Sequence, residues 1–111
     1  MADVFQVLAD PTRRRIVEVL RGGERSVGEL VQAVDIGQPG VSRQLAILED
    51  ADFVTVRPDG RRRLYSLRPE PFAELSRFVT AYRAIWEGRL DRFAAELERR
   101  RRNNQGKEKR K

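Results

Sequence analysis

The sequence predicts a winged helix-turn-helix fold, mainly α with a β-hairpin wing. Three observations carry that prediction. Two short amphipathic segments separated by a few residues lie within residues 26–50, and this is the arrangement of a helix-turn-helix. The hydrophobic period then changes from 3.6 to 2 over residues 53–68, where an Asp-Gly pair separates two short strands. A long helical stripe of apolar residues follows over residues 71–98.

Two helices are expected before the helix-turn-helix. Val4, Phe5 and Leu8 form one short apolar face. Asp10-Pro11 then marks a second helix start, because aspartate caps free N–H groups and proline fits the first helical turn. Gly22-Gly23 is expected to end this second helix.

The helix-turn-helix opens on a capping box, Ser26-Val27-Gly28-Glu29, in which the hydroxyl and the carboxylate each satisfy an orphan N–H group. Asp35-Ile36-Gly37 is the expected turn into the second helix. On a helical wheel, Val41, Leu45 and Leu48 share the buried face of that second helix. The exposed face at its N-terminal end then consists of Gln38, Pro39, Ser42 and Arg43.

These four residues have side chains suited to base edges in the major groove. Arg43 can donate two hydrogen bonds to guanine, and Gln38 can pair in a similar way with adenine. Ser42 can reach a base or a phosphate, and Pro39 offers an apolar surface to a thymine methyl. The N-terminal end of this helix is therefore expected to enter the groove, with acidic residues at its other end, at Glu49, Asp50 and Asp52.

The predicted wing carries arginines that can neutralise phosphates or enter the minor groove: Arg57, Arg61, Arg62 and Arg63. A polar helix front or an arginine-rich hairpin, taken singly, is more often solvated surface. The two in this order and with the same sign of charge favour double-stranded DNA as the partner. A protein-interaction adaptor on the same fold is an alternative, which an acidic wing or helix front would have favoured.

The net charge of +6 arises in the last residues of the chain. Residues 99–111 hold eight of the 23 basic residues and one of the 17 acidic ones. The rest of the chain therefore carries 15 basic and 16 acidic residues. This tail has no apolar residue and is expected to be disordered. We therefore expect one domain over residues 1–98 and a basic tail over residues 99–111.

The sequence contains no cysteine and no histidine. This excludes disulfides, thiolate chemistry and imidazole-based metal or acid–base sites. We predict no catalytic residues, no metal and no cofactor, and thus no enzyme. No apolar run of about 18 residues or secretion signal is present, so the expected location is cytoplasmic, away from membranes.

The last predicted helix is too long for one small domain to cover. From residue 72 to 98 it would extend about 40 Å, whereas a domain of this size is about 30 Å across. A second copy is the simplest partner, so a homodimer through the first and last helices is expected. The predicted interface is Val4, Phe5, Leu8, Phe78, Val79, Tyr82, Trp86, Leu90 and Phe93. Alternatively, four aromatic residues of the last helix line a pocket for a small-molecule effector between the subunits, namely Phe78, Tyr82, Trp86 and Phe93.

Four segments, DPTRRRIVEVL, SVGELVQAV, QPGVSRQLAILEDADFV and RPDGRRRLYSL, resemble the ArsR-type winged-helix repressors, over about residues 2–98. The last helix, YRAIWEGRLDRFAAELE, is similar to that of the SdpR-like autorepressor subgroup. The resemblance implies a homodimer that binds a pseudo-palindromic operator and often represses its own operon. It also implies that Gln38, Pro39, Ser42 and Arg43 occupy recognition positions and residues 61–63 the wing.

The chain departs from that family at three places. Metal-sensing members carry cysteines near the position of Ser26, or metal ligands on the last helix, so metal–thiolate sensing is not expected here. Many relatives have histidine where this chain has Gln44, which lies beside the buried face on the wheel. Relatives commonly have Ala-Gly-Leu before the wing, where this chain has Ala51-Asp52-Phe53.

Overall fold

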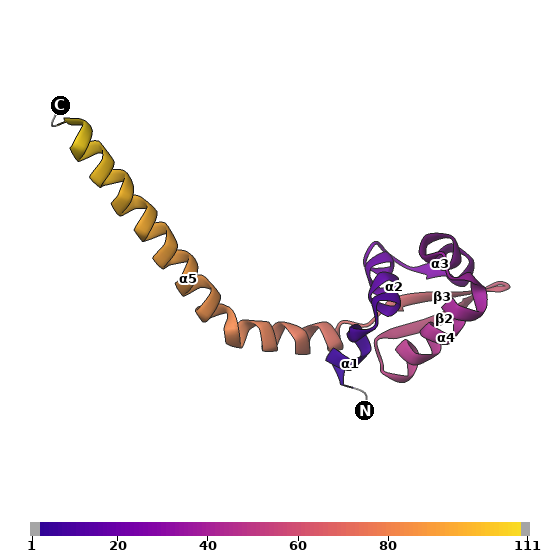
Figure 1. The fold of residues 1–111 in the computed structure, drawn as a ribbon. Helices are drawn as coiled ribbons and strands as arrows, with labels where there is room; N and C mark the ends of the chain where they lie inside the picture. Colours follow the sequence, from indigo (N-terminus) through magenta and orange to yellow (C-terminus); the bar gives the residue numbers. More distant parts are fainter. Residues whose placement is uncertain (1–2, 110–111) are drawn as a thin grey trace. The chain divides into compact units, whose positions relative to one another are not determined.

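The computed structural model describes the backbone of residues 3–109 and the side chains of residues 3–104. The chain divides into two compact units, Met1–Leu75 and Ser76–Lys111. The first unit is a winged helix-turn-helix, and the second is the continuation of the last helix (Figure 1). The elements are α1 (Val4–Ala9), α2 (Pro11–Arg21), β1 (Arg25–Ser26), α3 (Val27–Val34), α4 (Gly37–Asp50), β2 (Val54–Asp59), β3 (Arg62–Leu67) and α5 (Glu70–Lys109).

Both predicted helix caps are confirmed. The Asp10 carboxylate accepts hydrogen bonds from the N–H groups of Thr12 (2.7 Å) and Arg13 (3.3 Å) at the start of α2. At the start of α3, the Ser26 N–H donates to the Glu29 carboxylate (3.0 Å), and the Glu29 N–H donates to the Ser26 hydroxyl (3.2 Å). The hydrogen bond from the Ser26 N–H holds the pKa of Glu29 below its ordinary value.

The wing is one strand larger than the predicted hairpin. The sheet has the order β1-β3-β2 and is antiparallel throughout. Its additional strand, β1, pairs Arg25 with Tyr65 and Ser26 with Leu64. A strand of two residues is too short to produce an alternating pattern, so β1 cannot be predicted from hydrophobic periodicity. β2 lies at the edge of the sheet, where Pro58 costs no ladder hydrogen bond to a further strand.

The wing turn lies one residue later than the Asp-Gly pair predicts. Asp59 pairs with Arg62, which leaves Gly60 and Arg61 as the two loop residues. Gly60 has a φ of 62° and Arg61 is not in the positive-φ region, as in a hairpin turn with glycine first. Arg61 therefore lies within the turn and not after it.

One apolar core holds the first unit together. The predicted buried face of α4, Val41, Leu45 and Leu48, is at most 1% exposed. The ring of Phe53 meets the ring of Phe72 edge-on at 5.8 Å between centroids, which fastens the first turn of α5 to this core. Val4, predicted to lie in a dimer interface, is only 5% exposed and belongs to the core of the first unit.

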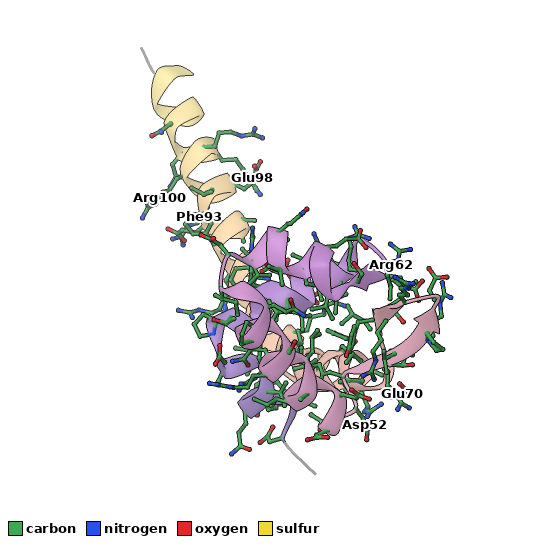
Figure 2. All side chains as sticks on the ribbon, turned by 90° about the vertical axis from the view of Figure 1, so that its right-hand side faces the viewer. Asp52, Arg62, Glu70, Phe93, Glu98 and Arg100 are labelled. Atoms are coloured by element: carbon green, nitrogen blue, oxygen red, sulfur yellow. The ribbon has the colours of Figure 1, made fainter. Side chains whose placement is uncertain are left out.

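The turn before the wing contains an aspartate with a positive φ. Asp52 has a φ of 59°, in the left-handed region that aspartate tolerates better than most residues. This conformation lets the Phe53 N–H donate to the Leu48 carbonyl at 2.9 Å. The Asp52 carboxylate lies 3.4 Å from the Arg68 guanidinium, on the surface of the first unit (Figure 2).

The second unit corrects the prediction of a disordered tail. α5 continues to Lys109, so residues 99–109 are helical, and residues 110–111 lie outside the described residues. Glu96 and Glu98 form ion pairs with arginines three and four positions later, and such pairs favour a helix. The arginines are Arg99, Arg100, Arg101 and Arg102. Within the described residues, no helix is both long and apolar enough to cross a membrane.

Candidate nucleic-acid interface

α4 is fixed by its buried leucines and presents a polar front. The turn before it uses two residues with positive φ, Asp35 (59°) and Gly37 (76°). α4 begins with no side-chain cap and no acidic residue in its first turn. The N–H groups of that turn and the helix dipole therefore favour an approaching anion such as a phosphate. The four predicted reading residues are all exposed: Gln38, Pro39, Ser42 and Arg43.

Arg43 is the side chain of this front with the strongest donors. Its guanidinium has no hydrogen bond or ion pair to any side chain within the described residues. The two residues that flank Arg43 in the chain differ in burial. Ser42 is exposed, whereas Gln44 is half-buried and accepts a hydrogen bond from Arg13 (3.1 Å). Arg43 is thus a free, forked donor on the exposed side of a helix whose other side is anchored.

The four predicted wing arginines differ in their surroundings. Arg57 donates two hydrogen bonds to the Glu24 carboxylate, at 2.8 and 2.7 Å, and this carboxylate raises the pKa of Arg57. Arg62 donates to Asp59 at 2.9 Å. Arg61 and Arg63 are exposed and form no ion pair with any described residue. The wing therefore presents two unpaired guanidinium groups, and Arg57 is tied to the protein itself.

The start of α4 and the wing meet at one hollow. It measures about 360 Å³ and is lined by Ser26, Val27, Gly28, Gln38, Arg61, Arg62 and Arg63. Figure 2 labels one of these lining residues, Arg62. The structure therefore brings Gln38 together with three of the four wing arginines, Arg61, Arg62 and Arg63, which lie on a separate element in the sequence. It also adds the first turn of α3, which sequence reasoning had treated as a cap alone.

Acidic residues lie at the opposite end of α4. Glu49, Asp50 and Asp52 are exposed there, and Asp52 is within 3.4 Å of Arg68. Since phosphate repels carboxylates, this end is disfavoured as a contact with nucleic acid. The charge distribution along α4 therefore has a direction, with its donor-rich end beside the wing.

The predicted dimer residues divide between the two units. In the first unit, Leu8 packs against the core and Phe5 is 45% exposed. In the second unit, the apolar residues of α5 are between 47% and 63% exposed, and Figure 2 labels Phe93 among them. The predicted members are Phe78, Val79, Tyr82, Trp86, Leu90 and Phe93, and Ile85 and Leu97 share their exposure.

The apolar residues of α5 also border a hollow. Five residues of this one helix line it, namely Phe78, Val79, Tyr82, Arg83 and Trp86. The rings of Phe78 and Tyr82 lie 4.9 Å apart and tilted. Within the described residues, no group of three or more carboxylates stands close enough to hold a metal ion.

Similarity to known proteins agrees with this geometry. Residues 8–57 match the model of a helix-turn-helix domain. The chain is 45% identical over 80 residues to the HTH-type transcriptional regulator Rv2034 of Mycobacterium tuberculosis, covering 68% of this chain and 75% of that protein. It is 36% identical over 67 residues to the transcriptional repressor SdpR of Bacillus subtilis, covering 60% of this chain and 74% of that protein.

Two solved structures extend the likeness to three dimensions. A crystal structure of an ArsR family transcriptional regulator superposes with a TM-score of 0.65 at 32% identity, covering 76% of this chain and 87% of that one. A homodimeric winged helix-turn-helix DNA-binding domain from Mycobacterium bovis is described as a possible ArsR-family regulator. It superposes with a TM-score of 0.60 at 29% sequence identity, covering 70% of this chain and 72% of that one.

The fold and this surface define a DNA-binding transcriptional regulator of the winged helix-turn-helix class. The chain belongs to the ArsR family of these regulators, and its relatives include the SdpR repressor.

Proposed function

We propose that this chain is a homodimeric repressor that binds a pseudo-palindromic operator with one copy of α4 in each of two major-groove half-sites. The observation that carries the proposal is the free guanidinium of Arg43 on the exposed front of an anchored helix, beside a basic wing. Transcriptional repression is what the name of the SdpR relative states for that protein. Half-sites about 10 bp apart are expected for two-fold-related recognition helices.

Base reading is proposed for the exposed front of α4, that is, for Gln38, Pro39, Ser42 and Arg43. Arg43 is the reader of guanine, because a bidentate pair needs two N–H donors of the guanidinium and no protein group occupies them. Backbone contacts are proposed for Arg61, Arg62 and Arg63, which line the same hollow as Gln38. Arg57 is proposed to contribute less to these backbone contacts, since the Glu24 carboxylate already neutralises its charge.

The dimer is proposed to form through the apolar face of α5, and Phe5 of α1 is proposed as a further interface residue. Covering that face by a second copy removes large apolar side chains from water. Its aromatic residues are proposed as packing between subunits. The basic residues after Glu98 are proposed to add non-specific attraction to DNA. Such a regulator acts in the cytoplasm beside the DNA and is not an enzyme.

The proposal is tested by selection of duplexes from a random-sequence pool with the full-length protein. Binding of the best selected duplex is compared with binding of a shuffled duplex of the same composition at physiological salt. A selected site with two-fold symmetry, bound at least about 10³-fold more tightly than the shuffled duplex, is the expected result. Equal affinity for both duplexes would refute the proposal.

A further inference from the structure

The guanidinium of Arg13 joins three helices of the first unit. From α2, its Nε donates to the Val7 carbonyl at 2.7 Å, and one of its Nη atoms donates to the Gln6 carbonyl at 3.3 Å. The other Nη donates to Gln44 Oε1 on α4 at 3.1 Å. α2 contacts both of these helices, so the fork lies where α1, α2 and α4 meet.

Each acceptor around Arg13 suits a fixed cation. Gln6 and Val7 belong to the last turn of α1, whose carbonyls have no partner within their own helix. The same nitrogen that reaches Gln44 is 3.5 Å from Asp10 Oδ2. Asp10 is itself held, because it caps α2 through its other oxygen. The side chain of Arg13 is only 16% exposed, so this network is largely shielded from solvent.

Gln44 is the connection of this network to the DNA-reading surface. It directly follows Arg43, the proposed reader of guanine, and precedes Leu45, which is 1% exposed. A glutamine that reads adenine needs its amide oxygen and nitrogen together. In this structure the oxygen accepts from Arg13 instead, and Gln44 is half-buried where Ser42 and Arg43 are exposed.

We propose that Arg13 is a positioning residue for sequence reading, which fixes the orientation of α4 through Gln44, and that Gln44 itself does not read a base. The guanidinium, carried by α2, donates to two carbonyls of α1 and to Gln44 of α4, so one rigid planar group holds α4 against α1 and α2. A small rotation of α4 would move Gln38, Ser42 and Arg43 together. This inference rests on the proposed function, since it assigns a role within DNA reading.

The test measures relative affinity for a panel of duplexes, each with one base pair of the selected site changed. Gln44→Met removes the acceptor at nearly constant size, and Arg13→Met removes the fork. Each is expected to reduce discrimination at every base pair read by α4 by about three- to tenfold. The double variant is expected to lose no more than the worse single variant, because both remove the same link.

Gln44→Glu is the conservative variant. It keeps an acceptor oxygen for Arg13, so the pattern of base preference is expected to survive. The affinity for all duplexes is expected to fall, because the new carboxylate repels the DNA phosphates. Arg15→Met is the matched control, as Arg15 lies on the same helix with an exposed side chain 4.0 Å from Glu18. Its pattern of preference should equal that of the unmodified protein.

Several outcomes would overturn the inference. If Gln44→Met abolishes preference at a single base pair and Arg13→Met leaves that pair discriminated, Gln44 is a direct reader. Additive losses in the double variant would show that the two residues act separately. Should Arg13→Met fail to fold, the contrast between Gln44→Met and Gln44→Glu decides alone, and equal profiles for these two contradict the proposal. Failure of the proposed function is distinct, because the unmodified protein would then show no preference.

Discussion

The guanidinium of Arg57 on β2 donates two parallel hydrogen bonds to the carboxylate of Glu24, at 2.8 and 2.7 Å. Glu24 directly precedes β1, so the pair connects the edge strand of the wing to the segment between α2 and α3. Arg61 and Arg63 have no such partner among the described residues. Arginines that look equivalent in the sequence are therefore unequal in their availability to phosphate.

This difference predicts unequal salt dependence. Each phosphate contact contributes about 0.9 to the slope of log affinity against log salt concentration. Arg63→Gln is expected to reduce that slope by about one unit, whereas Arg57→Gln is expected to change it by less than half of that. Titrations of a shuffled duplex at several salt concentrations measure both slopes. Equal slope changes for the two variants would mean that DNA displaces Glu24 from Arg57.

If the apolar face of α5 forms the dimer, a single acidic substitution within that face should dissociate it. Trp86 is 63% exposed in the single chain, and Trp86→Glu would place a carboxylate within the proposed contact between two copies. The variant is expected to be monomeric at micromolar concentration, where the unmodified protein is dimeric. Sedimentation velocity gives both masses.

Ala95→Glu is the matched control for Trp86→Glu, because residue 95 lies on the opposite side of the helix and is also exposed. This variant should remain dimeric. An unmodified protein that is monomeric at micromolar concentration would contradict the role proposed for α5.

The capping box predicts a pH-dependent contribution to stability. The pKa of Glu29 is lowered by the hydrogen bond from the Ser26 N–H. Since the folded pKa lies below the unfolded one, the carboxylate stabilises the fold above the unfolded value, and that contribution is lost as the pH falls through the folded pKa. Glu29→Gln is thus expected to be less stable than the unmodified protein at pH 7, with the gap narrowing below about pH 4.

Urea unfolding at a series of pH values measures that gap. Glu18→Gln, which changes an exposed glutamate on α2, is its control. A gap for Glu29→Gln that is constant with pH, or one that Glu18→Gln reproduces, would show that the capping carboxylate has no such effect.

The turn before the wing predicts a preference at residue 52. Asp52 has a φ of 59°, a conformation that β-branched residues adopt only with strain. Asp52→Val is expected to be less stable than Asp52→Gly by about 1–2 kcal/mol, since both remove the contact with Arg68 and only valine is strained. Thermal unfolding of the two variants gives the comparison. Equal stability would contradict the left-handed conformation.

Much of the fold was predictable because its signals are local. The caps at Asp10 and Ser26 depend on residues within one helical turn. The buried face of α4 follows from the helical period of Val41, Leu45 and Leu48. These interactions join neighbours in the chain, so a short window of sequence contains all the partners.

The rest was not predictable because its partners are distant in the chain. Arg57 and Glu24 are 33 residues apart, and Arg13 and Gln44 are 31 apart. A single sequence gives no sign of which arginine meets which acceptor. The burial of Val4 within its own unit was not predictable either, because an apolar residue has the same sequence pattern whether its own domain or a second copy covers it. The helix after Glu98 was missed because its support comes from charged pairs and not from an apolar face.

The most direct test of sequence reading by α4 is the affinity of Arg43→Ala for the selected and the shuffled duplex, measured by fluorescence anisotropy at physiological salt. We expect a loss of about 1–3 kcal/mol on the selected duplex, a smaller loss on the shuffled one, and relaxed preference at one base pair in each half-site. Equal losses on both duplexes, with the base preference unchanged, would make Arg43 a phosphate contact and refute its proposed role as a reader of guanine.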